Sequence, residues 1–461
     1  MKKNLTLILS LIIAGTMCAP LWAQTEPTVY VCGIDGNGKA VYWKNGTVFP
    51  LTDGTTRNAL AGSIFVDGND VYVAGHEAYD QEHGWTQAKY WKNGEAIPLT
   101  YGVYDYYGNP GIYYFYNGVA PPFSVNSGAT SIFVDNGNVY AVGWQYSVKR
   151  YPDSDSYYAY LSRSASIWTN GLPGTLAYSR GFDVTGYILS DSQANSIFVS
   201  NGDVYAAGIV APSSAADANF TATYWKNGVQ TNLTDGTKNA IANSIYVSGN
   251  DVYVAGYVRD STKMNQYGLW VTYYTLKLWK NGIATDLGSG ASCEATSVFV
   301  SGNDVYVAGY MSKACYWKNG QRTDVISSFY SRPSAIYVLD GDVYMAGYSL
   351  SSSIAVYWKN GQEVVLSNKT GSAAYGIFVT PGSPTGIPTV ETGRALSLHA
   401  WVENGALHVS GLTAGETWSV YNVAGVRIYT NIAGANLQSV PIQSHGIYIV
   451  KQGNNAVKTI Y

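Results

Sequence analysis

One arrangement of apolar strands and Gly/Asn turns recurs seven times between residues 28 and 379. A copy has an apolar tetrapeptide such as residues 244–247, a turn, a Val-Tyr strand that ends in Gly, and a Trp strand that ends at Asn-Gly. Asn and Gly accept positive φ, so these pairs suit two-residue hairpins. Four short strands per unit, repeated every 40 to 75 residues or so, are typical of a β-propeller.

The first and last copies are incomplete in complementary ways. The chain enters the repeats at a Val-Tyr strand, residues 29–33, and leaves them at a tetrapeptide, residues 376–379. A closed ring uses both halves, because the last strand completes the first blade, whereas a linear solenoid gains nothing from the offset. We therefore predict an all-β, seven-bladed β-propeller over residues 24–379, in which residues 376–379 pair with residues 29–32.

The strands of each copy are apolar on both faces, as expected for sheets packed between neighbouring sheets. Large aromatic side chains in such strands usually form the core. We predict blade-to-blade packing for the Trp that recurs in the third strand: Trp43, Trp91, Trp168, Trp225, Trp279, Trp317 and Trp358.

The long insertions are all predicted on one face of the ring. Strands of an antiparallel blade alternate in direction, so second-to-third and fourth-to-first connections emerge together. Every long insertion falls in these connections, and Tyr, Gly, Asn and Ser, the mixture typical of binding loops, dominate them. The candidate binding residues are Tyr101, Tyr104, Tyr106, Tyr107, Tyr113, Tyr114, Tyr116, Trp144, Tyr157, Tyr158, Trp270 and Tyr273.

The same insertions have a second interpretation as extended hairpins whose Tyr side chains pack on one another. Candidate chemistry is sparse. His76 and His83 flank acidic residues in one insertion, but their spacing matches no ligand pattern for a metal. No phosphate loop, dinucleotide motif or nucleophile motif occurs. We predict no catalytic residue, no metal site and no cofactor.

Composition narrows the class of protein further. Charged residues make up 12% of the chain and the net charge is −3, so nothing suggests binding to nucleic acid. Beyond residue 23 the cysteines are Cys32, Cys293 and Cys315. We expect all three to be small buried thiols. A disulfide between Cys293 and Cys315 is the alternative, because both lie in one repeat.

The N-terminal stretch, residues 1–23, has the form of a secretory signal peptide. Lys2 and Lys3 precede an apolar stretch, and Ala23 ends the segment. Cys18 raises a lipoprotein alternative, but Met17 stands where that signal needs Gly, Ala or Ser. No later run is long and apolar enough to span a bilayer. We expect a protein that is secreted or on the outer cell surface.

The repeats give way to a linker over residues 380–394 and a small Ig-like β-sandwich over residues 395–461. The sandwich contains Trp-Ser-Val-Tyr-Asn-Val-Ala-Gly-Val-Arg-Ile-Tyr at 418–429 and Gly-Ile-Tyr-Ile-Val-Lys at 446–451. In these motifs it resembles the type A C-terminal sorting domain of the type IX secretion system. The resemblance implies a Gram-negative cell and contact with secretion machinery. The propeller repeats also resemble secreted proteins with the same Tyr-Trp-Lys-Asn-Gly phrase, a resemblance that implies no activity.

Two functions remain from the sequence. The favoured one is a non-catalytic surface protein that binds a glycan or a protein through its Tyr-rich insertion face. The alternative is a polysaccharide-degrading enzyme with carboxylates at the mouth of the central channel, where two opposed carboxylates would be required.

Overall fold

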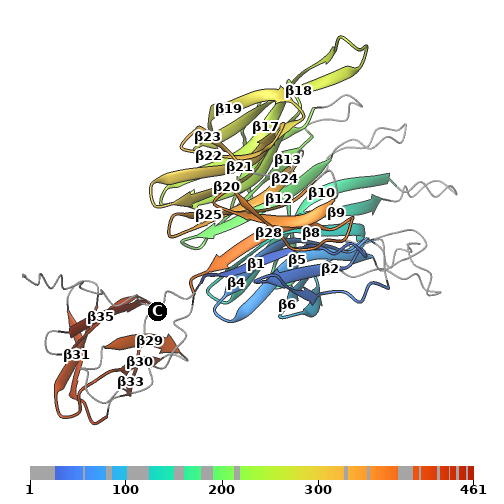
Figure 1. The fold of residues 1–461 in the computed structure, drawn as a ribbon. Helices are drawn as coiled ribbons and strands as arrows, with labels where there is room; N and C mark the ends of the chain where they lie inside the picture. Colours follow the sequence, from blue (N-terminus) through green and yellow to red (C-terminus); the bar gives the residue numbers. More distant parts are fainter. Residues whose placement is uncertain are drawn as a thin grey trace, which may run out of the picture. The chain divides into compact units, whose positions relative to one another are not determined.

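A computed structural model describes residues 26–55, 58–78, 86–100, 124–149, 160–177, 191–211, 219–325, 331–349, 353–382, 398–403, 406–422, 426–435, 437–442, 446–452 and 455–460. The chain divides into two compact units, Met1–Ser383 and Pro384–Tyr461. The boundary falls inside the segment that the sequence predicts as a linker. The first unit contains seven four-stranded antiparallel sheets, which confirms the seven-bladed propeller (Figure 1).

Within each blade, strands that follow one another along the chain are hydrogen-bonded neighbours, and β28 joins the first blade beside β1. The closing blade is β28(Ala373–Thr380), β1(Thr28–Ile34), β2(Ala40–Lys44) and β3(Thr47–Pro50); the next is β4(Leu60–Asp67), β5(Asp70–Ala78), β6(Thr86–Lys92) and β7(Glu95–Pro98). Then come β8(Ser124–Asp135), β9(Asn138–Lys149), β10(Tyr160–Thr169) and β11(Leu172–Ala177), followed by β12(Ser192–Ser200), β13(Asp203–Val210), β14(Thr221–Lys226) and β15(Val229–Asn232). The last three are β16(Ala240–Ser248), β17(Asp251–Met264), β18(Trp270–Lys280) and β19(Ile283–Ala291); β20(Cys293–Ser301), β21(Asp304–Met311), β22(Ala314–Lys318) and β23(Gln321–Asp324); and β24(Ser331–Leu339), β25(Asp342–Ser349), β26(Ile354–Lys359) and β27(Gln362–Val365).

The predicted closure of the ring is confirmed. Strand β28 pairs with β1, and residues 376–379 face residues 29–32 in the expected register, with Val379 opposite Val29 and Gly376 opposite Cys32. The two strands lie side by side in Figure 1 although they come from opposite ends of the repeats. The seven inner strands, which are the first strand of each repeat, contact one another in a closed circle.

Each inner strand is longer than the predicted tetrapeptide and carries a β-bulge just before it. In the β4 strand the register shifts between Ala61 and Ser63, which makes Gly62 the bulged residue. The bulge pushes the carbonyl of Leu60 against Gly75 of β5, where a Cβ would lie 1.8 Å from that oxygen. The same close approach, at 1.9 to 2.2 Å, occurs at the equivalent glycine of every other blade: Gly33, Gly143, Gly208, Gly256, Gly309 and Gly347. The repeated Gly of the second strand is therefore required by the bulge.

Seven aromatic side chains form a closed ring around the central channel, and we call it the aromatic collar. Each is the third residue of an apolar tetrapeptide: Phe65, Phe133, Phe198, Tyr246, Phe299, Tyr337 and Phe378. All seven neighbouring pairs have ring centroids 4.4 to 5.0 Å apart in tilted orientations. Tilted pairs at this separation are favourable beyond the area they bury.

Serine hydroxyls connect neighbouring inner strands beside the collar. Ser131 Oγ accepts a hydrogen bond from the Ile197 backbone N–H of the next blade at 3.2 Å. Ser63, Ser196, Ser244 and Ser297 make the same connection to their next blades at 3.1 to 3.3 Å. The two remaining tetrapeptides begin with Ala335 and Gly376, which have no hydroxyl.

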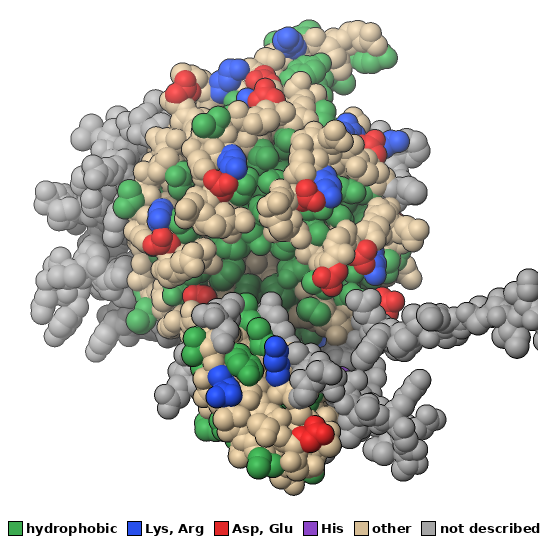
Figure 2. Space-filling model, turned by 90° about the vertical axis from the view of Figure 1, so that its left-hand side faces the viewer, with side chains coloured by type: hydrophobic (Ala, Val, Ile, Leu, Met, Phe, Trp, Pro, Cys, Tyr) green, Lys and Arg blue, Asp and Glu red, His purple; other side chains and the backbone are tan. Residues whose placement is uncertain are grey.

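The predicted blade-to-blade core is confirmed, since all seven repeated Trp side chains are at most 2% exposed. On the face with short turns, the Asn of each Asn-Gly turn bonds to the preceding hairpin of its own blade. Its side-chain oxygen accepts a backbone N–H at 2.8 to 2.9 Å in all seven blades, as in Asn227 with Val204. In five blades a Lys beside this Asn pairs with an Asp, as in Lys226 with Asp203. Figure 2 shows such basic and acidic side chains in neighbouring pairs around a face hollowed at its centre.

The second unit is a small sandwich of two antiparallel sheets. One sheet is β29(His399–Glu403), β30(Ala406–Ser410) and β33(Gln438–Pro441); the other is β32(Arg427–Ile432), β31(Thr417–Asn422), β34(Ile447–Gln452) and β35(Asn455–Ile460). Trp418, Leu407 and Val450 are fully buried in its core. In the propeller, Cys32, Cys293 and Cys315 are free buried thiols, so the disulfide left open by the sequence is not formed.

Candidate functional site

The candidate site lies at one end of the central channel, which we call the mouth. Every inner strand begins, and every second strand ends, on the face that carries the insertions. The bulged residue and the residue two positions before it therefore stand at this end of each inner strand. The residue two positions before the bulge pairs with a residue of the second strand, the one that follows the repeated Gly, and together they form the rim of the mouth. In this way Glu294 faces Tyr310, and Arg332 faces Tyr348.

A pocket of about 250 Å³ opens among these positions, and we call it the mouth pocket. It extends from the blade of β16 across those of β20 and β24 to the closing strand β28. Its lining residues are Asn243, Glu294, Thr296, Tyr310, Arg332, Pro333, Ser334, Tyr348 and Tyr375. One carboxylate, one guanidinium, one amide and three tyrosines thus converge from four neighbouring blades.

Glu294 supplies the carboxylate of the mouth pocket. Its Oε1 accepts a hydrogen bond from Asn243 Nδ2 at 3.1 Å, and the same amide nitrogen donates to the Ala295 carbonyl at 2.8 Å. Burial raises the pKa of Glu294, while the nearby positive charge of Arg332 works in the opposite direction. Burial and the adjacent Glu294 carboxylate together raise the pKa of Tyr310 to about 12. At neutral pH Tyr310 is therefore a neutral hydroxyl.

Arg332 packs over the ring of Tyr310. Its Cζ is 4.2 Å from the centroid of the Tyr310 ring, within the range of a cation–π contact. Its Nη2 donates to the Tyr310 hydroxyl, and the side chain also hydrogen-bonds Tyr348. The Nε–H is buried and has no acceptor among the residues that the structure describes. Tyr348 in turn meets Tyr375 edge to face, with centroids 6.4 Å apart.

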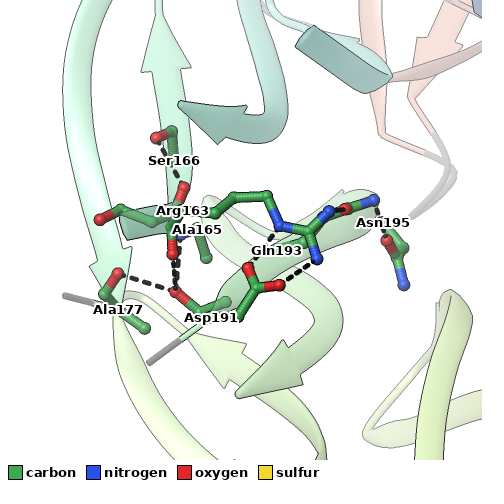
Figure 3. A network of polar contacts seen from close by, with 9 residues as sticks. Arg163, Ala165, Ser166, Ala177, Asp191, Gln193 and Asn195 are labelled. Atoms are coloured by element: carbon green, nitrogen blue, oxygen red, sulfur yellow. Dashed lines mark hydrogen bonds and ion pairs between the residues drawn. The ribbon is translucent and has the colours of Figure 1, made fainter. Parts of the chain in front are cut away.

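A second arginine, Arg163, donates through each of its three nitrogens to side chains of the neighbouring blade (Figure 3). Arg163 of β10 binds Asp191 through two nitrogens, at 2.5 and 2.7 Å, and donates to Gln193 at 2.7 Å. Gln193 donates to Asn195, which donates to the Ala242 carbonyl of the next blade. This bidentate pair closes a joint between blades. By contrast, Glu294 and Arg332 retain hydrogen-bonding capacity directed into a pocket.

A larger hollow of about 380 Å³ lies outside the channel, between the blades of β12 and β16. Its charged groups are engaged with one another: Lys238 pairs with Asp260 at 3.3 Å, and Lys277 pairs with Asp286 at 2.5 Å. Thr275 also donates to Asp260. Because its charged groups are paired with one another, this hollow offers a ligand fewer unpaired charges than the mouth pocket.

The structure describes three of the predicted binding residues. Trp144 follows the repeated Gly of its blade and stands at the mouth, in edge contact with Tyr146 at 5.5 Å. Trp270 and Tyr273 lie on the β17–β18 hairpin, which projects from the ring in Figure 1, and are 69% and 38% exposed. The other candidates lie outside the described residues: Tyr101, Tyr104, Tyr106, Tyr107, Tyr113, Tyr114, Tyr116, Tyr157 and Tyr158.

Some insertion sequence forms extended hairpins, as the second interpretation expected. Strands β9 and β10 pair from Tyr140 to Lys149, and β17 and β18 pair over their full length. Tyr257 and Tyr274 of the latter hairpin touch edge to face at 5.3 Å. Trp270 at the end of that hairpin is nevertheless well exposed. The same hairpin therefore carries aromatic side chains that pack on each other and one that is free to contact a ligand.

The structure gives no support to a metal site that includes His76. Burial lowers the pKa of His76 to about 4, and His83 lies outside the described residues. Among the residues whose placement is described, no three His, Cys, Asp or Glu side chains gather as a metal site would need. Within the same residues, no helix is long and apolar enough to cross a membrane.

Sequence reasoning missed the mouth pocket, although the repeats contain a signal for it. The position two residues before the bulge reads Leu, Gly, Gln, Ile, Glu, Arg and Ala through the seven copies, and the bulge itself reads Gly, Thr, Asn, Asn, Thr, Ser and Tyr. The flanking positions are almost constant. Divergence at two positions of an otherwise uniform repeat marks where the blades differ in chemistry.

Comparison with known proteins adds no family. No family model matches the chain, and no curated protein matches it. Among solved structures it is similar to a puromycin hydrolase at 9% identity and a TM-score of 0.40, over 84% of this chain and 57% of the hydrolase. It is similar to the Trypanosoma rangeli sialidase at 8% identity and a TM-score of 0.39, over 90% of this chain and 86% of that one.

A third similar structure is PorZ, a surface component of the type IX secretion system of Porphyromonas gingivalis. The identity is 10% and the TM-score 0.25, over 93% of this chain and 73% of PorZ. The chain thus spans just over half the length of the hydrolase and most of the other two. At these scores the likenesses carry no argument about function, which has to come from the site.

Proposed function

We propose that this protein is a secreted or cell-surface, non-catalytic propeller that binds a glycan or a protein through its insertion-bearing face. The observation that carries the proposal is the mouth pocket, where tyrosine faces surround a carboxylate and a guanidinium with unused hydrogen-bonding capacity. Concave sites with aromatic walls and a few converging polar groups are the usual form of ligand sites. The features of the pocket favour a glycan, because sugars combine hydroxyls with apolar ring faces.

The insertion tyrosines extend the same proposal around the mouth. Trp144 stands on the rim, and Trp270 and Tyr273 project from the β17–β18 hairpin. Exposed Tyr and Trp side chains dominate the energy of many interfaces. Replacing Tyr104, Tyr106 and Tyr107 by Ala should weaken binding by about 1 to 3 kcal/mol, as aromatic contacts do elsewhere.

A glycan array and a screen for protein partners, run on the full chain and on the Tyr triple variant, test this proposal. The expected result is selective binding that the triple variant weakens while its thermal stability is kept. Binding that is unchanged in the triple variant and in Trp144→Ala would place the ligand elsewhere. Loss of folding in the triple variant would show that these residues are core.

The alternative is a polysaccharide-degrading enzyme. Hydrolysis by two carboxylates needs a second group facing the first, at about 5 to 10 Å. Among the described residues that line the mouth pocket, Glu294 is the one carboxylate, and Asp191 at the other described cluster is bound by Arg163. A hydrolase panel separates the two: release of sugar that disappears in Glu294→Gln would favour the enzyme.

Export remains part of the proposal. The signal peptide expected over residues 1–23 and the sorting-domain resemblance of the second unit support secretion from a Gram-negative cell, with that unit contacting secretion machinery. Cell fractionation tests it. Recovery of the protein in the medium or at the surface, lacking residues 1–23, is expected, whereas a cytoplasmic protein that retains them would refute export.

A further inference from the structure

The mouth pocket has both donors and acceptors to offer. The Glu294 carboxylate receives one amide hydrogen bond, from Asn243, although a carboxylate can accept about four. Arg332 contacts Tyr310 and Tyr348, whereas a guanidinium has five N–H donors. Its Nε–H is buried out of reach of a ligand, so a bond to a ligand would come from its Nη groups. Polar groups that are largely buried and partly unsatisfied gain most from a ligand that completes them.

The charges of the pocket select against charged ligands. Glu294 and Arg332 carry opposite charges and line the same pocket, so their charges nearly cancel and the pocket carries little net charge. An anion on Arg332 would meet repulsion from Glu294, and a cation on Glu294 would meet repulsion from Arg332. A neutral group that donates to the carboxylate and accepts from the guanidinium is a hydroxyl, and two neighbouring hydroxyls use both sites at once.

The walls and the size of the pocket limit the ligand further. The rings of Tyr348 and Tyr375 meet edge to face at an interplanar angle of 63°, which offers an apolar face beside the polar pair. The volume of about 250 Å³ is below the roughly 300 Å³ at which pockets for drug-sized molecules begin. It suits a single sugar ring entering from the mouth rather than a chain passing through.

We infer that the mouth pocket holds one uncharged sugar ring at the end of a glycan, with two neighbouring hydroxyls held between Glu294 and Arg332. The inference rests on the proposed function, because it names the ligand of the same face. It makes Glu294 and Arg332 the residues that decide specificity, with Tyr348 and Tyr375 as the stacking surface. No covalent step is involved.

Calorimetric titration of the full chain with simple sugars tests this assignment. The probes are the methyl glycosides of glucose, galactose and mannose, with glucuronic acid and glucosamine as charged counterparts. At least one neutral glycoside should bind wild type about fivefold or more tightly than its charged counterparts, since each of these meets one like charge. Glu294→Gln should shift preference toward glucuronic acid by about tenfold, and Arg332→Gln should shift it toward glucosamine.

These opposite shifts separate specificity from a structural role, because a damaged pocket would lose all sugars together. Asp203→Asn, on the other face of the ring, changes the net charge like Glu294→Gln and should leave the preference unchanged. If array glycans bind but neutral glycosides do not, or if preference is the same in both pocket variants, the inference is wrong and the proposed function stands. If neither glycan nor protein binds the chain at all, both fall.

Discussion

Replacing Gly75 by Ala is expected to destabilise the propeller, although the backbone of Gly75 does not require glycine for its φ. An added Cβ would lie 1.8 Å from the Leu60 carbonyl oxygen and 2.9 Å from its carbon. Ordinary C···O contacts are about 3.3 Å or longer, so the carbonyl would have to move by about 1.5 Å. Overpacking of this kind costs about 1 to 3 kcal/mol, against a gain of about 0.4 to 1 kcal/mol from a stiffer unfolded chain.

Gly62→Ala is the matched control within the same blade. Gly62 is the bulged residue itself, and its nearest neighbour to a new Cβ is the Thr130 carbonyl oxygen at 3.5 Å, an ordinary contact. We expect this variant to be neutral or slightly more stable, so the two alanines should differ by about 2 kcal/mol. Urea unfolding followed by fluorescence of the buried tryptophans measures both. If Gly75→Ala is as stable as Gly62→Ala, the bulge does not explain the repeated glycine.

Three further outcomes follow from the core and the buried groups. Ser131→Ala leaves the Ile197 N–H without its 3.2 Å partner and should cost about 1 to 3 kcal/mol of unfolding free energy; an unchanged urea midpoint would contradict the serine connections. Trp225→Ala should cost roughly 3 to 5 kcal/mol, and Trp225→Phe much less, because the indole N–H has no acceptor among the described residues; equal losses would be unexpected. Burial lowers the pKa of His76 to about 4, so on acidification the unfolded chain takes up this proton before the folded chain does. The free energy of unfolding should therefore fall by up to about 3 kcal/mol as the pH drops from about 6.5 to 4, and this contribution of His76 is fully present above about pH 6.5. His76→Gln should remove this part of the pH slope, and identical slopes in wild type and variant would show that His76 is not the group responsible.

The repeats made the ring predictable, because turn chemistry and apolar periodicity act locally and recur. Asn-Gly turns fix each hairpin, and the incomplete copies at the ends imply that β28 joins β1, as it does. The bulge in each inner strand was not predictable in the same way. It depends on close packing against the glycine of the neighbouring strand, and a sequence shows that glycine without showing what approaches it.

The candidate site was predicted at the level of the face but not of the residues. Parity of the strands places the insertions, and Trp144 stands at the mouth on that face. Glu294 and Arg332 are 38 positions apart and carry no motif, so only the ring geometry brings them together. Likewise β33, a strand of four residues in the second unit, is too short for its pattern to indicate a strand.

The gaps in the serine connections have a consequence for how the ring comes apart. Ala335 lies on β24, next to the closing strand, and Gly376 lies on the closing strand β28 itself. Both joints of the blade built from the two ends of the repeats therefore lack these hydroxyls. Transient opening should therefore begin at this seam, and the other joints should stay shut. Tyr375 belongs to β28 and Tyr348 to the neighbouring blade, and both line the mouth pocket. A ligand in that pocket would touch both sides of the seam, so occupancy and ring closure stabilise each other.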